Sequence, residues 1–290
     1  TGTQMSDEAD VTFVGGHAVE QHDAGQEPTG DHAEELEAAK KAVKAAIEKA
    51  GKEGAEDGAK LSKRNGETSI AWYREQGFLP EAICNYLALL GWSPGDDREN
   101  ITMQELVELF NVERVNSSPA RFDMKKLEAI NGDKIRALTI DDFLQRAIPF
   151  LKSASVITGS EAEVALVRKA LPMIQERIVK LKEVVPMLGF LFVDSVSIEA
   201  ESAGKMAEEQ ALHVLAKALT VLEPLSTWNH ESIESVLRVA LIEEMGLKPR
   251  NAFGPVRIAV TGSHISPPLF QSMELLGKER SIARIKALVR

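Results

Sequence analysis

The sequence has a single cysteine, Cys84, among its 290 residues. One cysteine cannot form an internal disulfide, and because Cys84 lies in an apolar helical pattern we expect a buried, reduced thiol rather than a nucleophile. The chain also lacks any apolar run close to the roughly 18 to 20 residues that cross a bilayer. Its N-terminus is acidic, whereas a signal peptide is basic and then apolar. These absences predict a cytoplasmic protein that does not enter a membrane.

An excess of basic residues is lacking as well, since the formal net charge is −10. The acidity is local: residues 1–58 contain 14 acidic and five basic residues, and the remaining 232 residues contain 30 acidic and 29 basic ones. A nearly neutral body can still present positive charge to phosphate on one face. The total charge gives no argument of its own for nucleic-acid binding.

The chain contains no alternation of strands and helices of the kind that builds a nucleotide-binding parallel sheet. Residues 1–58 are rich in Gly, Asp, Glu and Gln, which predicts a largely disordered extension or an exposed helix. Beyond them, helix start and stop signals follow one another. We predict an all-α chain with one helical domain over 59–155 and a second over 156–290, separated at Thr158-Gly159-Ser160.

Several helices can be outlined from their capping and apolar patterns. Pro80 suits a first helical position, and the residues that share the apolar face of that helix are Ile83, Leu87 and Leu90. Asp123 opens a helix that we expect to stop near Asn131-Gly132. Ser160 opens a segment whose apolar period runs over residues 164–181 and predicts one long helix, in which Pro172 could introduce a kink. Residues 255–261 fit a short helix better than a strand, because a proline opens them and a glycine closes them.

The segment Lys60-Leu61-Ser62-Lys63-Arg64 is a short basic turn. Two ammonium groups and a hydroxyl that converge on one anion can hold phosphate oxygens and stabilise growing charge on them. Taken alone, such a turn is more typical of a solvated loop.

The surrounding sequence resembles bacterial glutamyl-tRNA synthetase, and in particular the actinobacterial members of that family. The strings that carry the resemblance, besides the basic turn, include Gly77-Phe78-Leu79-Pro80-Glu81-Ala82, Pro255-Val256-Arg257-Ile258-Ala259-Val260-Thr261-Gly262 and Ser266-Pro267-Pro268-Leu269-Phe270. The resemblance covers roughly residues 60–290. It implies that Lys60, Ser62 and Lys63 are catalytic residues and that Lys60 and Lys63 bind ATP.

The resemblance also implies that 59–155 contacts the inner bend and stem of a tRNA and that 156–290 holds the anticodon. Arg177 matches the arginine that reads the third anticodon base, where a guanidinium fork can discriminate C from G. The positions that match contacts to the other anticodon bases are Arg257, Ser266, Pro267 and Leu269, the last offering an apolar surface. Judged from the residues alone, Arg177 is a solvated charge paired with Glu176 or Glu183.

In this family a longer catalytic fold with a His-x-Gly-His signature precedes the basic turn. Here residues 1–59 precede it, and the nearest string, Val14-Gly15-Gly16-His17, lacks the second histidine. We therefore expect the tRNA-binding C-terminal half of a glutamate–tRNA ligase, inactive by itself, and a fragment of that enzyme is the simplest account.

The cofactors implied are ATP and Mg²⁺ in the intact enzyme, and we expect this chain alone to bind neither a cofactor nor a metal. The partners implied are tRNA-Glu, together with glutamate and ATP through the N-terminal half, and we expect a monomer. Two alternatives stay open: a catalytically inactive RNA-binding protein derived from the synthetase, or a scaffold subunit of a larger ribonucleoprotein.

Overall fold

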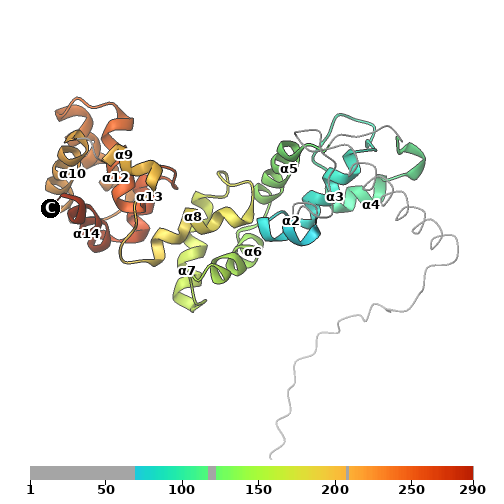
Figure 1. Cartoon of the computed structure of the whole chain (residues 1–290), viewed down its shortest axis with the longest axis horizontal. Coiled ribbons are helices and arrows are strands. Elements are labelled where there is room, and N and C mark those ends of the chain that lie inside the picture. The colour runs from blue at the N-terminus through green and yellow to red at the C-terminus, as the bar shows by residue number, and fades with distance from the viewer. Residues whose placement is uncertain (1–68, 117–121, 207–208, 290) are drawn as a thin grey trace, which may run out of the picture. The chain divides into compact units, whose positions relative to one another are not determined.

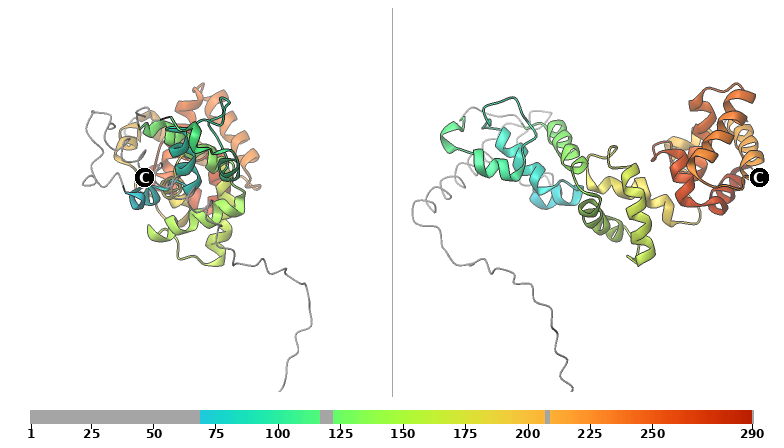
Figure 2. Two further views of the ribbon diagram at one scale, coloured as in Figure 1. Left: turned by 90° about the vertical axis from the view of Figure 1, so that its right-hand side faces the viewer. Right: turned by 180° about the vertical axis from the view of Figure 1, so that it is seen from behind.

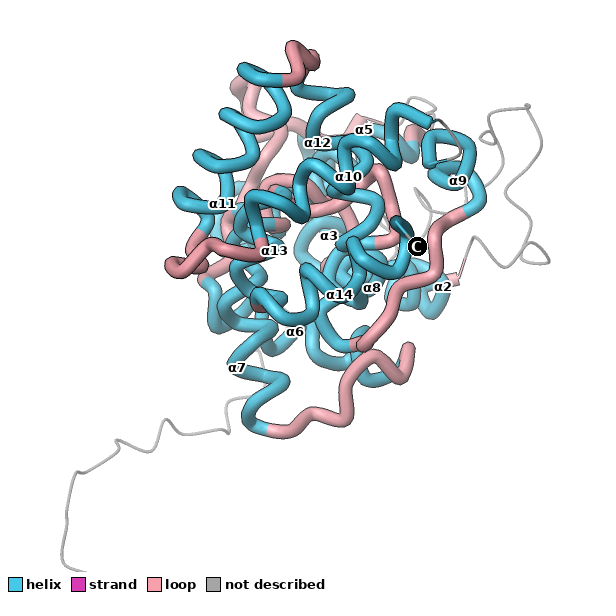
Figure 3. Tube along the Cα trace, turned by 90° about the vertical axis from the view of Figure 1, so that its left-hand side faces the viewer, coloured by secondary structure: helices cyan, strands magenta, loops and turns pink. Residues whose placement is uncertain are grey.

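The computed structural model of the protein describes residues 69–116, 122–206 and 209–289. All of these residues fall within one compact unit of the chain. Figure 3 draws them as helices and loops alone, so the all-α prediction is confirmed for this part of the chain. None of its helices is long and apolar enough to span a membrane. The acidic extension and the basic turn of Lys60, Ser62 and Lys63 lie outside the described residues.

The helices follow one another in three groups along the chain (Figure 1). The first group is α2 (Ile70–Gln76), α3 (Pro80–Leu89), α4 (Met103–Leu109), the short η2 (Val112–Arg114) and α5 (Met124–Arg136). The second is α6 (Ile140–Ser153), α7 (Glu161–Ala170), η3 (Leu171–Met173), η4 (Leu181–Glu183), α8 (Val184–Leu188) and η5 (Gly189–Phe192). The third is α9 (Ala200–Met206), α10 (Glu209–Leu222), α11 (His230–Leu237), the π-helical η6 (Arg238–Glu244), α12 (Pro249–Thr261), α13 (Leu269–Leu276) and α14 (Lys278–Val289).

Helix ends that depend on local chemistry lie where the sequence predicts them. Complete capping boxes open α4 at Thr102 and α7 at Ser160, with Glu105 and Glu163 as the reciprocal partners. Asp123 caps α5 by accepting a hydrogen bond from the Lys126 amide. These contacts satisfy amide groups that have no partner inside the helix.

The prediction of one long helix over residues 164–181 is wrong. Helix α7 ends at Ala170, and the chain continues through the 3₁₀ turn η3 and a further turn that includes Arg177. Pro172 has no amide hydrogen to donate within a continuing helix. Ile174 and Ile178 are nevertheless fully buried, so their spacing reflects burial from successive turns rather than one helix face.

The prediction that the α5 helix stops near Asn131-Gly132 is also wrong, because α5 continues to Arg136. The Asn131 side chain is buried and forms hydrogen bonds to backbone groups that are distant in the sequence. Its Oδ1 accepts from the Leu79 amide at 2.7 Å, and its Nδ2 donates to the Val179 carbonyl at 2.5 Å and to the Gly77 carbonyl at 3.3 Å. Asparagine commonly ends helices, but here the Asn131 side chain joins α5 to two other segments, and the helix continues past it.

The prediction of a buried Cys84 is wrong as well, since this side chain is exposed. Helix α3 buries Ala82, Asn85 and Tyr86 instead of the face that contains Ile83. Tyr86 is 1% exposed, and its hydroxyl accepts a hydrogen bond from the amide of Asp123, the residue that caps α5. The hydrogen bonds of Asn85 and Tyr86 to residues outside α3 therefore bury the face that contains these two polar side chains. The apolar residues of α3 alone would favour burial of a different face.

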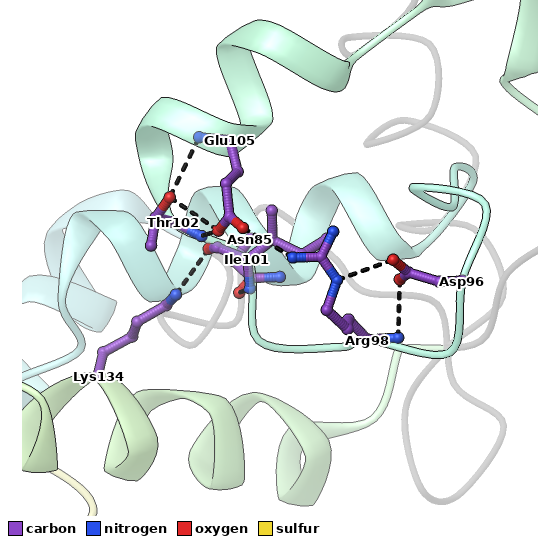
Figure 4. Close-up of polar contacts among 7 residues, drawn as sticks. All are labelled: Asn85, Asp96, Arg98, Ile101, Thr102, Glu105 and Lys134. Carbon is purple, nitrogen blue, oxygen red and sulfur yellow. Dashed lines mark hydrogen bonds and ion pairs between the residues drawn. The ribbon is translucent and has the colours of Figure 1, made fainter.

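A cluster of polar contacts fixes the loop between α3 and α4 (Figure 4). The Asn85 side chain accepts from the Ile101 amide at 2.8 Å, and Lys134 of α5 donates to the Ile101 carbonyl at 2.6 Å. Arg98 forms ion pairs with Asp96 at 2.8 Å and Glu105 at 2.7 Å. Burial lowers the pKa of Lys134. The loop is thus held by α3, α4 and α5 together.

The third group of helices forms a bundle, visible in orange and red in the right view of Figure 2. Helices α10, α12 and α14 pack against one another. Val214, Leu215, Val256 and Ile285 are fully buried between them. Burying such aliphatic side chains contributes about 1.5–3 kcal/mol each, so this packing is what fixes α12, the helix that contains Arg257.

Candidate nucleic-acid interface

Arg257 connects α12 to the loop that precedes α13. Its neighbours Val256 and Ile258 are buried, while the Arg257 side chain is only half-buried. Its Nη1 donates to the Ser266 hydroxyl at 2.6 Å and to the Pro267 carbonyl at 2.8 Å. The guanidinium is therefore oriented by the loop, and the loop in turn is held against α12.

The loop after α12 is anchored at two further points. Gly262 ends the helix at φ +83°, in the left-handed region that glycine favours. The Ser263 hydroxyl donates to the Glu199 carboxylate at 2.6 Å. The His264 amide donates to the Ser202 hydroxyl at 3.0 Å, and the His264 Nδ1 lies 2.9 Å from the same oxygen. These contacts leave the loop little freedom to change shape.

The apolar side chain that this loop exposes is Ile265, which is 62% exposed. Ser266 and Pro267 on its C-terminal side are buried, and Leu269 is only 3% exposed. Leu269 belongs to the core and offers almost no surface to a base in this conformation. Sequence reasoning missed Ile265, although an isoleucine within a polar loop between a glycine and a proline is a signal that could have identified it.

Arg177 lies in the turn that follows α7, and its side chain is exposed. The turn is fixed by Gln175, whose Nε2 donates to the Ile135 carbonyl at 3.0 Å and the Leu138 carbonyl at 2.9 Å. Within the described ranges Arg177 forms no ion pair. Glu183 instead accepts from the Val179 amide at 3.0 Å, so the pairing of Arg177 with Glu183 is not seen.

Arg177 and Arg257 come close enough for their charges to interact. Burial, together with the positive charge of Arg177, lowers the pKa of Arg257. Two like charges near one another create a site that favours an anion or a polar, electron-rich group. The donors of Arg257 on Nη1 are already used by the loop, whereas the planar fork of Arg177 is free to donate two hydrogen bonds to a base edge.

The structure thus brings together Arg177, Arg257, Ser266 and Pro267, which the sequence predicts as contacts of one RNA segment. No group of three side chains suited to hold a metal ion occurs among residues 69–116, 122–206 and 209–289. An exposed guanidinium beside an anchored loop can donate hydrogen bonds to the edge of an unstacked RNA base.

Comparison with known families identifies that domain. The profile described as "Anticodon binding domain" matches residues 142–289, and the profile described as "tRNA synthetases class I (E and Q), catalytic domain" matches residues 37–129. The chain belongs to the glutamate–tRNA ligase family and corresponds to the C-terminal portion of those enzymes. The resemblance to the actinobacterial members is confirmed.

Relatives show the extent of the match. The chain is 50% identical over 232 residues to the glutamate–tRNA ligase of Nocardioides sp. and 48% identical over 231 residues to that of Saccharopolyspora erythraea. Each alignment covers 79% of this chain, but 47% and 46% of the relative, so the chain spans about half the length of the curated relatives it matches.

A solved structure agrees with this assignment. The glutamate tRNA ligase from Elizabethkingia meningosepticum, in complex with its amino acid, aligns with a TM-score of 0.67 and 25% identity. The alignment covers 82% of this chain and 49% of that one. The glutamate-tRNA synthetase from Elizabethkingia anophelis gives a TM-score of 0.64.

Proposed function

We propose that this chain binds tRNA-Glu and that Arg177 reads the third anticodon base. The observation that carries the proposal is the exposed Arg177 fork, which has no ion pair within the described residues and lies close enough to Arg257 to lower its pKa. A base edge with two acceptors satisfies such a fork. On the Watson–Crick edge of an unstacked base, cytosine presents the acceptors N3 and O2 where guanine presents N1–H and N2–H donors, so one arginine that binds this edge can favour C over G.

The other residues around the site have supporting roles. Arg257 orders the loop by donating to the Ser266 hydroxyl and the Pro267 carbonyl. Ile265 supplies the exposed apolar surface on which a splayed base packs, in place of the buried Leu269. Truncating Ile265 to alanine removes three carbon atoms from that contact and should weaken tRNA binding by up to about 2 kcal/mol, at roughly 0.8 kcal/mol for each carbon that a base covers.

Together with a catalytic half, the proposed activity is the attachment of glutamate to tRNA-Glu in the cytoplasm. ATP and Mg²⁺ would supply the adenylate chemistry, and the basic turn would hold the pyrophosphate side of ATP through Lys60, Ser62 and Lys63. The family assignment and the match of residues 37–129 to the catalytic-domain profile support this proposal. We propose that the protein acts as a monomer.

The experiment that tests the anticodon assignment is filter binding of the purified chain to tRNA-Glu transcripts that carry C or G at the third anticodon base. Arg177→Gln should reduce the preference for C by roughly 1–3 kcal/mol, which is the scale of one well-oriented base contact. Lys286→Gln is a matched control, because it removes an exposed cation that pairs with Glu223 on another surface. An Arg177→Gln chain with an unchanged preference would show that Arg177 is a solvated surface charge.

A further inference from the structure

Arg284 of α14 is a buried arginine whose partners are all backbone carbonyls. The residue is 4% exposed. Its Nη1 donates to the Val260 carbonyl at 2.5 Å, its Nη2 donates to the Phe190 carbonyl at 2.8 Å and to the Val193 carbonyl, and its Nε donates to the Asp194 carbonyl at 3.3 Å. No carboxylate pairs with it within the described part of the chain.

These carbonyls belong to two different parts of the candidate site. Val260 is in the last turn of α12, three residues after Arg257, where helix carbonyls lack partners inside the helix. A cation at this end of a helix is favoured by the helix dipole. Phe190 lies in η5, and Val193 and Asp194 follow it in the segment that leads to α9. One side chain therefore joins the helix that contains Arg257 to the end of the helical group that contains Arg177.

Arg280, one turn earlier on α14, contacts the same segment. Its Nη1 donates to the Leu191 carbonyl at 2.9 Å. Burial, and then the charge of Arg280, lower the pKa of Arg284 to about 10. Arg284 thus stays protonated at neutral pH and keeps all its donors.

Arg177 and Arg257 need such a connection because nothing attractive joins them directly. Their like charges repel, and no hydrogen bond between their two side chains is found in the described residues. The turn of Arg177 is fixed to α5 through Gln175, and Arg257 is fixed to its own loop through Ser266. The second and third helical groups are joined by the packing of α13 against α7 and by the segment after η5 that Arg280 and Arg284 hold, so the spacing between the two guanidinium groups depends in part on that segment.

We propose that Arg284 is a positioning residue that holds Arg177 and Arg257 at the spacing required by one bound anticodon. This inference rests on the proposed function, in which both arginines face the same tRNA loop. Arg284 itself does not contact RNA, because it is buried among backbone carbonyls. Its effect on recognition is exerted through the distance between α7 and α12.

The first measurement of the test needs no RNA. Cys84 is the sole cysteine, so Cys84→Ser gives a background in which Lys169→Cys on α7 and Asn251→Cys on α12, both at exposed positions, receive spin labels. Electron–electron dipolar spectroscopy then reports the distribution of distances between the labels. Arg284→Met should broaden and shift this distribution, whereas Lys286→Met, a cation lost from the same helix, should leave it unchanged.

The second measurement uses unlabelled chains and tRNA-Glu transcripts with C or G at the third anticodon base. Arg284→Met should lose most of the preference for C, and adding Arg177→Gln to it should then have little further effect, because coupled residues give non-additive changes. Circular dichroism confirms that each variant is folded. If Arg284→Met does not fold, Arg284→Lys carries both measurements, since it keeps the charge but replaces the fork by a single nitrogen.

The outcomes separate this inference from the proposed function. A folded Arg284 variant with an unchanged distance distribution, or with an unchanged preference for C, would overturn the positioning role while the unmodified chain still preferred C. Equal affinity of the unmodified chain for both transcripts would refute the proposed function and the positioning role with it.

Discussion

Gly77→Ala tests how the turn of Arg177 is attached to the first group of helices. Gly77 ends α2 at φ +88°, and its carbonyl accepts a hydrogen bond from the Leu181 amide at 3.0 Å. A Cβ added at Gly77 would lie 2.5 Å from the Leu181 nitrogen and 2.6 Å from the Lys182 nitrogen. Because both neighbours are backbone atoms, the segment after Arg177 would have to move to accept the methyl group.

The loss of stability expected for Gly77→Ala has two contributions. A non-glycine residue in the left-handed region costs roughly 1–2 kcal/mol, and forcing extra volume into a packed contact costs about 1–3 kcal/mol more. Gly246→Ala is the matched control, since Gly246 has φ +66° and a Cβ there would meet no atom within 4 Å. It should lose only the conformational part.

Urea unfolding of the two variants measures the difference directly. Gly77→Ala should be less stable than Gly246→Ala by about 1–3 kcal/mol, which is the cost of the added contact. For a unit of this size the difference corresponds to a gap in Tm of roughly 2–12 °C. Equal losses of stability in the two variants would refute the close approach of Gly77 to residues 181 and 182.

Two further predictions concern catalysis and pH. The purified chain should show no glutamate-dependent pyrophosphate exchange, because a phosphate-gripping turn alone cannot orient both substrates for reaction; robust exchange would contradict this. Hydrogen bonds from Thr158 and Ser160 lower the pKa of Glu163 from 4.5 to about 2, so its ionised form stabilises the fold above pH 4.5 and that contribution is lost as pH falls towards 2. Glu163→Gln should therefore be less stable than the unmodified chain at pH 7, with a difference that shrinks in urea titrations between pH 4.5 and pH 2; a pH-independent difference would count against the capping role.

Local chemistry explains what the sequence could predict of the fold. The capping boxes of α4 and α7 and the glycine that ends α12 depend on residues only a few positions apart, so their patterns can be recognised without tertiary information. Two of the three wrong predictions involve long-range contacts, whereas the break after α7 coincides with Pro172, a local signal. Asn131 lies inside α5 because it bonds to residues about 50 positions away, and Cys84 is exposed because Asn85 and Tyr86 take the buried face of α3.

The candidate site also contains some residues that the sequence predicts and some features that it does not. Sequence resemblance places Arg177, Arg257, Ser266 and Pro267 in one site, and the structure brings them together although Arg177 lies in a turn rather than a helix. The exposure of Ile265 and the carbonyl partners of Arg284 depend on packing between distant segments. The place of Ile265 in a polar loop is a signal for its exposure, whereas no spacing in the sequence indicates the carbonyl partners of Arg284.

We propose that this chain recognises the anticodon of tRNA-Glu. Competition filter binding with the unmodified chain tests this recognition directly, using transcripts that differ only by C or G at the third anticodon base at one fixed salt concentration. We expect a preference for C of roughly 1–3 kcal/mol, or about 5- to 150-fold in affinity. Equal affinity for the two transcripts would contradict it.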